Sequence, residues 1–478
     1  MTTSQTDRAD ERSIDDSGRA LPRARWWRDG FRPLLARLHF FIGVFVGPFI
    51  LIAAVTGLMY AATPAIEQIV YRDTLTVAPS GSPLPLAQQV SAAQEAQVDG
   101  TLIEVRPATR PDDVTRVTFS TESDPADRDL TVFINPYSGE VTNTLPTFGE
   151  WLPVRSWFDD LHRTLFLGDI GRLYSELAAS WLWVLAASGL SIWIFRRVRK
   201  GRRRTLVIPT RRAKGRARLM GWHGALGVWL ALGMIFLSAT GLTWSQYAGT
   251  NVGNLREALD WTTPSAAAAL PENTEVPEIP ERELPAALER AAESARDEGL
   301  DGIIKIVPAE RGEAWTVSQA QRSWPEKQDS ISVNPATGQV LSRVDFADWP
   351  LAAKLARWGV DAHMGLLFGA ANQIVLGALA IGIIFMILLG YRMWWLRRPT
   401  ARAARSSYLR PPGAGRTPTR VAIFMIALLG VGAGLFAPAL GGSLILFLAV
   451  DLALGAFIRR RASRPDSTER KHSSASVG

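Results

Sequence analysis

The chain has 478 residues, a formal net charge of +8 and no cysteine. The lack of cysteine excludes iron–sulfur clusters, thiolate zinc sites, disulfides and covalently attached c-type haem. The basic residues lie beside long apolar segments and form no separate basic domain, so the positive charge reflects membrane topology and indicates no nucleic-acid partner.

Six apolar segments predict an α-helical integral membrane bundle. Four are long enough to cross a hydrocarbon core of about 30 Å as helices. Two shorter ones predict a helical hairpin with Gly and Pro at its turn. In chain order the segments are 40–62, 176–196, 223–246, 370–396, 420–437 and 440–458. With their flanks, the predicted membrane regions are 31–62, 156–197, 220–247, 351–398 and 420–459.

Lysine and arginine determine the predicted orientation. Residues 196–218 carry twelve basic side chains and no acidic one, whereas residues 63–170 carry sixteen acidic and seven basic side chains. We therefore expect cytoplasmic loops at 198–219 and 399–419, and both termini in the cytoplasm. The polar ends, 1–30 and 460–478, predict disordered tails.

Two small α+β units are predicted on the outer face. In the first, 63–155, a helix at 85–97 precedes strands near 102–107 and 113–121 and a hairpin whose turn is Asn135-Pro136-Tyr137-Ser138-Gly139. The second, 248–350, contains a Pro/Glu-rich linker at 262–281, a helix at 283–298, strands near 303–308 and 314–319, and the turn Asn334-Pro335-Ala336-Thr337-Gly338. In both turns Pro fixes φ and Gly supplies the left-handed position that joins two strands.

Four of the five histidines occupy equivalent places in this duplication. His39 and His223 each lie eighteen residues before the Gly of a Thr-Gly pair, and His162 and His363 each lie 34 residues before an Arg-Arg pair. Because the two halves run in the same direction, an axis along the membrane normal should relate them. His39 and His223 then share a depth near the cytoplasmic face, and His162 and His363 share one near the outer face.

Such facing pairs of imidazoles can hold a flat iron porphyrin from both sides. The inner histidines lie on helix faces lined by small residues at i+4 and i+8, namely His39, Gly43 and Gly47, and His223, Gly227 and Ala231. We therefore predict two haem b groups with bis-histidine iron, and Gly43 and Gly227 as part of the inner site. Two imidazoles leave the iron no open position, which favours electron transfer over oxygen chemistry.

Other interpretations of these residues remain open. A glycine stripe also serves close helix packing, and the histidines could bind a non-haem metal, move protons or be purely structural. Arg37, Arg163 and Arg218 are candidate partners for haem propionates. Glu176 and Asp451 lie in apolar segments, where helix-end or hairpin packing is the simpler role. The acidic strip 122–129 is interpreted as a solvated loop.

The repeated helix–strand–hairpin units resemble PepSY domains, and the His-bearing spans resemble the PepSY-associated transmembrane family, over residues 30–400. That family includes iron-regulated inner-membrane proteins and ferric-siderophore reductases. The resemblance implies a bacterial inner-membrane protein that reduces a ferric-siderophore or other ferric chelate to Fe(II) on the outer side. Its electron donor would be a cytoplasmic reductase or a membrane quinol.

Two other functions are compatible with the sequence. PepSY domains elsewhere act as propeptide-like protease inhibitors, so the chain could be a membrane-anchored regulatory protein that binds a peptidase and has no redox activity. A transporter that uses the histidines as metal ligands is disfavoured, because cation pathways usually contain acidic residues within the membrane and this chain has few.

Overall fold

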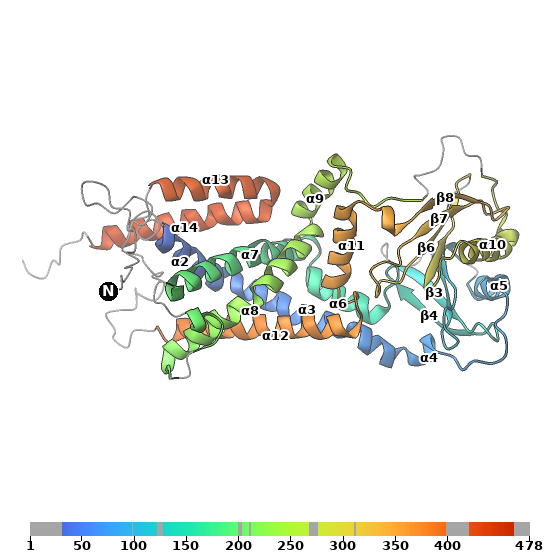
Figure 1. Cartoon of the computed structure of the whole chain (residues 1–478), viewed down its shortest axis with the longest axis horizontal. Helices are drawn as coiled ribbons and strands as arrows, with labels where there is room; N and C mark the ends of the chain where they lie inside the picture. The colour runs from blue at the N-terminus through green and yellow to red at the C-terminus, as the bar shows by residue number, and fades with distance from the viewer. Residues whose placement is uncertain are drawn as a thin grey trace, which may run out of the picture.

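The computed structural model describes residues 31–97, 99–121, 128–198, 203–209, 212–266, 276–309, 312–397 and 420–462. The molecule is elongated, with a helical bundle at one end and a sheet domain at the other (Figure 1). The predicted tail at 1–30, the loop at 399–419, most of the acidic strip and nearly all of the tail at 460–478 lie outside the described residues.

Four helices of the described chain are long and apolar enough to cross a membrane. They are the continuous helix Arg32–Val70, α7 (Gly168–Val198), α8 (Gly215–Thr243) and α12 (Ala370–Trp395). The first is made of α2 (Arg32–Phe41), the π-helical turn η2 (Ile42–Val46) and α3 (Gly47–Val70). Large apolar side chains such as Leu232 and Ile374 are exposed on the bundle, as expected where a helix faces lipid. The four longest predicted segments are thus confirmed as helices, and the chain is a multi-pass membrane protein.

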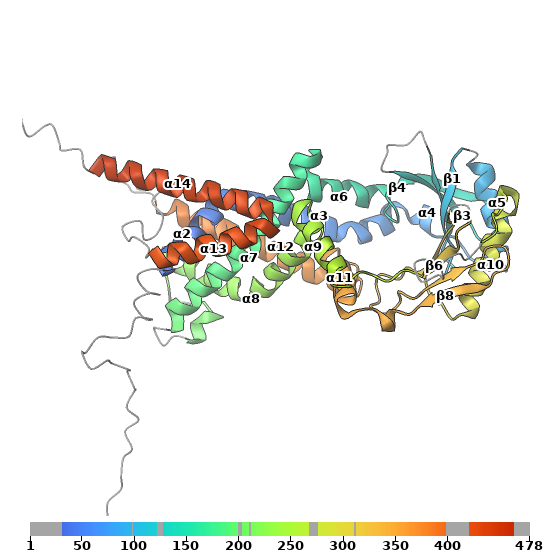
Figure 2. The same ribbon diagram turned by 90° about the horizontal axis from the view of Figure 1, so that it is seen from above.

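Helices α13 (Arg420–Phe436) and α14 (Pro438–Ala462) form the predicted hairpin. The hairpin lies against the bundle, where α14 packs on α7 (Figure 2). The Trp181 indole donates a hydrogen bond to Ser443 Oγ at 2.8 Å, and Leu440 and Leu444 join the bundle core. That these two helices also cross the membrane stays a prediction.

The two predicted outer units form one continuous antiparallel sheet of eight strands. Its order is β4-β3-β2-β1-β5-β6-β7-β8, so the first strand of each unit pairs with that of the other, with Val105 opposite Ile306. The strands are β1 (Thr101–Arg106), β2 (Thr115–Ser120), β3 (Asp129–Ile134), β4 (Val141–Thr147), β5 (Ile304–Val307), β6 (Trp315–Gln319), β7 (Ser330–Val333) and β8 (Val340–Val344). Each unit matches the predicted order of helix, strands and hairpin.

The sheet has one apolar and one polar face, because side chains alternate along each strand. Helices α5 (Leu86–Ala96) and α10 (Leu284–Asp297) cover the apolar face, which is turned away from the bundle (Figures 1 and 2). Residues of both units, including Val105, Val117, Ile306 and Val317, share one core with these helices. The polar face is turned toward the bundle.

Three helices lie where the sheet domain meets the bundle (Figure 1): α6 (Pro153–Thr164), α9 (Tyr247–Ala258) and α11 (Leu351–His363). The buried carboxylate of Glu176, from α7, accepts the backbone N–H groups of Tyr247 and Ala248 at 2.9 and 3.2 Å. Glu176 therefore caps the N-terminus of α9, where a negative charge is favourable. The remaining short turns are α4 (Arg72–Leu75), η3 (Arg203–Leu206), η5 (Glu281–Glu283) and η6 (Phe346–Asp348).

Candidate functional site

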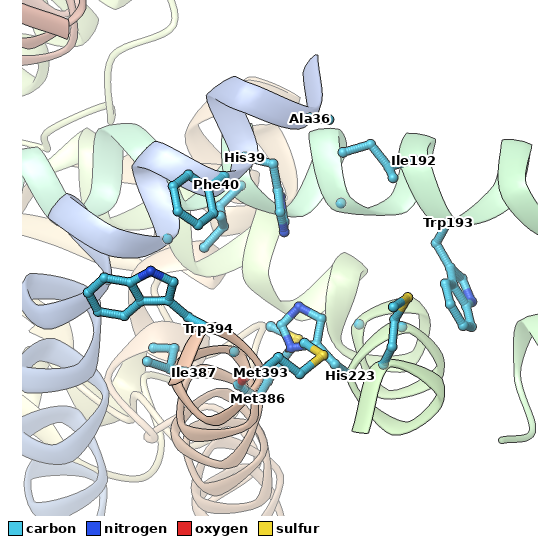
Figure 3. Close-up of a pocket in the computed structure, with 18 of the residues that line it drawn as sticks. Ala36, His39, Phe40, Ile192, Trp193, His223, Met386, Ile387, Met393 and Trp394 are labelled. Carbon is cyan, nitrogen blue, oxygen red and sulfur yellow. Dashed lines mark hydrogen bonds between the residues drawn. The ribbon is translucent and has the colours of Figure 1, made fainter. Parts of the chain in front are cut away.

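His39 and His223 lie opposite each other inside the bundle. His39 projects from α2 and His223 from α8, and the two rings point toward one another across a cavity (Figure 3). Their ring centres are 6.4 Å apart and the ring planes are at 80°. The duplication therefore brings the inner pair of histidines face to face, as the sequence predicts.

Hydrogen bonds fix the tautomer of both inner rings. His223 Nδ1 lies 3.0 Å from the carbonyl oxygen of Met386, which can only accept, so Nδ1 carries the proton. His39 Nδ1 lies 3.0 Å from Ser188 Oγ, whose own hydroxyl donates to Leu185 O at 3.1 Å. Both rings thus keep Nε2 unprotonated, which is the form that binds a metal.

The cavity between these rings has a volume of about 470 Å³, within the range of ligand sites. A Cβ added at Gly43 would meet nothing within 4 Å, and one added at Gly227 would only touch the Met386 sulfur at 3.5 Å. Gly189 and Gly390 lie against the two imidazoles, with their ideal Cβ positions 2.8 Å and 3.7 Å from Cε1 of His39 and His223. Small residues therefore leave room both beside and behind each ring.

A π-helical turn, η2, follows His39 by one helical turn and shapes this cavity. Such turns displace backbone groups from the regular helical pattern and are frequent at functional sites. Here the carbonyl of Val44 accepts a hydrogen bond from Tyr391 Oη at 3.2 Å. The same hydroxyl lies 2.9 Å from the position that a Cβ of Gly47 would take, so a larger residue there would displace Tyr391.

Four arginines line the end of the cavity that is remote from the sheet domain. Each comes from a different span or its edge, and together they are Arg32, Arg196, Arg216 and Arg397. No acidic side chain is among the described residues that line the cavity. Arg37 and Arg218, the predicted propionate partners beside the inner histidines, do not line it. Arg163, the predicted partner beside the outer His162, lies 3.6 Å from Asp159, and its role stays a prediction. For the inner site, sequence proximity to a histidine does not identify the lining arginines, because the side chains that meet at one depth come from different helices.

The outer histidines have the same kind of support, and each is held within its own half. His162 Nδ1 lies 2.9 Å from Thr56 Oγ1, and His363 Nδ1 lies 2.6 Å from Thr240 Oγ1. Each threonine hydroxyl donates to the carbonyl four residues earlier on its helix, at 2.9 and 2.7 Å, so its oxygen accepts from the ring. The Nδ1-protonated tautomer, with Nε2 unprotonated, is therefore common to all four histidines.

Both outer histidines are largely but not completely buried. Burial lowers the pKa of His162 and of His363 to about 4, and the nearby His162 lowers that of His363 further. Both are therefore neutral at physiological pH, as metal ligands must be. Neither lines the cavity between the inner rings.

The inner site fits a metal held by one imidazole on each side. A metal lies about 2 Å from a ligating imidazole nitrogen, and that nitrogen lies about 1.1 Å from the ring centre, so two such rings are centred about 6.2 Å apart. The observed 6.4 Å agrees with this separation. Within the described residues there is no group of three or more His, Asp or Glu side chains that could hold a metal ion. Two opposed nitrogens suit a metal whose other ligands come from a flat macrocycle.

The sequence pattern predicts the four histidines but not the residues that orient them. Thr56 and Thr240 stand in the duplicated Thr-Gly pairs, and a Cβ added at the glycine of each pair would lie 3.1 Å from Cε1 of His162 and 3.8 Å from Cε1 of His363. Gly189 and Gly390 each precede an Arg-Arg pair by seven residues. These spacings recur in both halves of the sequence, and that repetition indicates the residues that support each ring.

A family comparison agrees with this duplicated arrangement. The family model described as the PepSY-associated TM region matches residues 36–397, which include all four histidines and both halves of the sheet. Among curated proteins, none matches the chain. Because the match extends over well more than half of the sequence, the chain belongs to the PepSY-associated transmembrane family.

Proposed function

We propose that this protein binds two b-type haems and carries electrons across the membrane. His39 and His223 would hold the inner haem, and His162 and His363 the outer one. The observation that carries the proposal is the inner pair, with facing rings 6.4 Å apart beside an apolar cavity. Iron held by two imidazoles exchanges single electrons and has no open position for dioxygen.

The protein's own groups orient the ligands and exclude water. Hydroxyl and carbonyl oxygens hold every Nδ1 proton, so the rings cannot turn away without losing a hydrogen bond. Such second-shell contacts raise the basicity of a ligand and fix its orientation. The arginines at the end of the inner cavity supply the positive charge that propionates require in a membrane.

The direction of transfer follows from the predicted topology. An electron from a cytoplasmic reductase or a membrane quinol would enter at the inner site, pass to the outer site and convert a ferric chelate outside to Fe(II). The chelate would be a ferric-siderophore or a related complex, and the bacterial inner membrane would be the location. The lower charge of Fe(II) weakens its binding to hard oxygen ligands, which frees the metal for uptake.

Absorbance spectra test this proposal. The purified chain, oxidised and then reduced with dithionite, should show a b-type spectrum corresponding to about two haems per chain. We expect the double variant His39→Ala/His223→Ala to retain about one haem, since each pair would hold one. His472→Ala is the matched control, because this histidine stands outside the duplicated frame.

Two results would overturn the proposal. A colourless preparation that takes up no added haemin would exclude both sites. Full haem content in the double variant would exclude the inner pair as ligands.

A further inference from the structure

A second cavity lies where the two halves of the sheet meet. It has a volume of about 480 Å³ and is placed between the polar face of the sheet and the starts of α6 and α11. Both halves contribute to its wall, with Arg106 on β1 and Lys305 on β5, the two central strands of the sheet. We call it the junction cavity. It does not exist in either half alone, so the sequence of one unit cannot reveal it.

The junction cavity has an excess of positive charge. Its charged lining consists of four basic and two acidic side chains: Arg106, Lys305, Arg322, Arg357, Glu104 and Glu150. Burial alone would raise the pKa of Glu150, but the charges of Arg106 and Arg322 lower it to about 2, so it is ionised. Asp361, only 2% exposed, is a further carboxylate that approaches Arg322 and Arg357. Three carboxylates thus face four cations.

A further, half-buried cation adjoins this wall. Arg116 lies against Glu104, Arg106 and Glu150 in a small adjoining cavity. Burial lowers the pKa of Arg116 and the charge of Arg106 lowers it further, while the charges of Asp113, Glu150 and Glu67 offset only part of this shift. A negatively charged ligand would relieve this repulsion between like charges, whereas a cation would increase it.

Aromatic side chains supply the rest of a binding surface. Trp151 and Trp349 each stand two residues before the helix that carries an outer histidine, and both line the cavity. Their indole N–H groups are buried and have no hydrogen-bond acceptor among the described residues. Buried donors without partners are rare in folded proteins, and oxygen atoms of a ligand are suitable acceptors for them.

The cavity is also connected to the outer histidines. Arg322 donates hydrogen bonds to Glu150 and, at 2.7 Å, to Asp361, which precedes His363 by two residues on α11. Arg155, two residues into α6, stacks over the Trp151 ring at 5.3 Å. A ligand in the cavity would therefore lie against both helices that carry the outer pair.

We propose that the junction cavity binds the oxygen-rich, anionic part of a negatively charged ferric chelate. The identity of this ligand as a ferric chelate rests on the proposed function. The junction cavity adds where the chelate binds and which charge it carries. Neutral and cationic chelates are disfavoured, because they leave the excess arginine charge in the cavity uncompensated.

Binding of gallium(III) citrate to the purified full-length chain tests the assignment. Gallium(III) is not reduced, so calorimetry measures binding whether or not the chain contains haem. We expect saturable binding that weakens between low and high NaCl, since salt screens charge interactions. Lys305→Glu should weaken it by about tenfold, and Lys305→Gln by less, because Lys305 is a partly exposed cation of the wall. Arg282→Glu makes the same charge change on a fully solvated side chain of the sheet domain and should bind as the wild type does.

Three outcomes contradict the assignment. They are unchanged affinity in Lys305→Glu, equal affinity for a positively charged gallium chelate, and equal affinity for citrate without metal. Normal thermal unfolding of each variant shows that a loss of binding is not a loss of fold. Gallium citrate binding by a chain that is colourless and takes up no added haemin would overturn the electron-transfer proposal and leave the junction cavity as an anionic-chelate site.

Discussion

At the scale of single residues, the site depends on the Nδ1 partners as much as on the histidines. Four rings use three kinds of acceptor, a serine hydroxyl, two threonine hydroxyls and a backbone carbonyl. All four enforce one tautomer, with the proton on Nδ1. Metal binding through Nε2 requires the proton on Nδ1, and any hydrogen-bond acceptor that reaches Nδ1 can hold it there.

Thr240→Val tests this role, because valine keeps the shape and removes the acceptor. We expect haem affinity of the outer site to fall by about 10- to 100-fold, as when a second-shell partner of a metal-binding histidine is lost. Thr243→Val is the matched control, since Thr243 on the same helix bonds to its own i−4 carbonyl and is exposed. Haemin titration of the haem-free chains measures the difference, and equal affinities in the two variants would contradict it.

At the scale of elements, the first span combines a long helix with a local departure from helical geometry. The turn Ile42–Val46 is π-helical, and Gly43 within it faces open space. A regular α-helix with a larger side chain at position 43 would fill part of the cavity. With the π-helical turn and Gly43, the first span keeps its full length and still leaves the inner site open.

Gly43→Leu should therefore close the inner site without unfolding the span. We expect the haem content to fall by roughly half, because added side-chain volume competes directly with a bound macrocycle. Gly442→Leu is the control, since this glycine is also in a helix with no atom within 4 Å of its ideal Cβ and is exposed. The pyridine haemochrome assay gives the haem content, and full retention by Gly43→Leu would show that the cavity does not hold the cofactor.

At the scale of the whole molecule, partly buried ion pairs join the two halves on the polar side of the sheet. Glu150 belongs to the first half and receives hydrogen bonds from Arg106 of that half and Arg322 of the other. Removal of one partner from such a partly buried network leaves charge uncompensated, and a hydrogen bond to a charged group commonly contributes about 1.5–3 kcal/mol. Glu150→Gln should lower the free energy of unfolding by about that amount, whereas Glu140→Gln at the exposed hairpin turn should have little effect.

The pH dependence distinguishes a charge effect from a packing effect. The folded-state pKa of Glu150, about 2, lies below its ordinary value of 4.5, so the ionised carboxylate stabilises the fold fully above about pH 4.5. That contribution is lost as the pH falls from 4.5 toward 2. The difference in melting temperature between the wild type and Glu150→Gln should therefore shrink between pH 5 and about pH 3. A constant difference over this range would contradict the ion-pair explanation.

Much of the architecture could be predicted from sequence, because its signals are local. Apolar length predicted the four spans, and alternation with Asn-Pro-x-x-Gly turns predicted the eight strands to within a few residues. The spacing of the histidines predicted the inner pair, because a parallel duplication brings equivalent positions to one depth. Each of these inferences depends only on helix or strand periods and on symmetry.

Tertiary structure alone decided the rest. The pairing of β1 with β5 joins the edge strand of one unit to the edge strand of the other, about 200 residues apart in the chain. Nothing in either strand specifies that partner. The four arginines of the inner cavity, the Nδ1 acceptors and the charged wall of the junction cavity each gather side chains from several elements. Local periodicity determines which elements form and which faces they bury. The packing of one half against the other determines which side chains meet, because contact depends on distances in space and not along the chain.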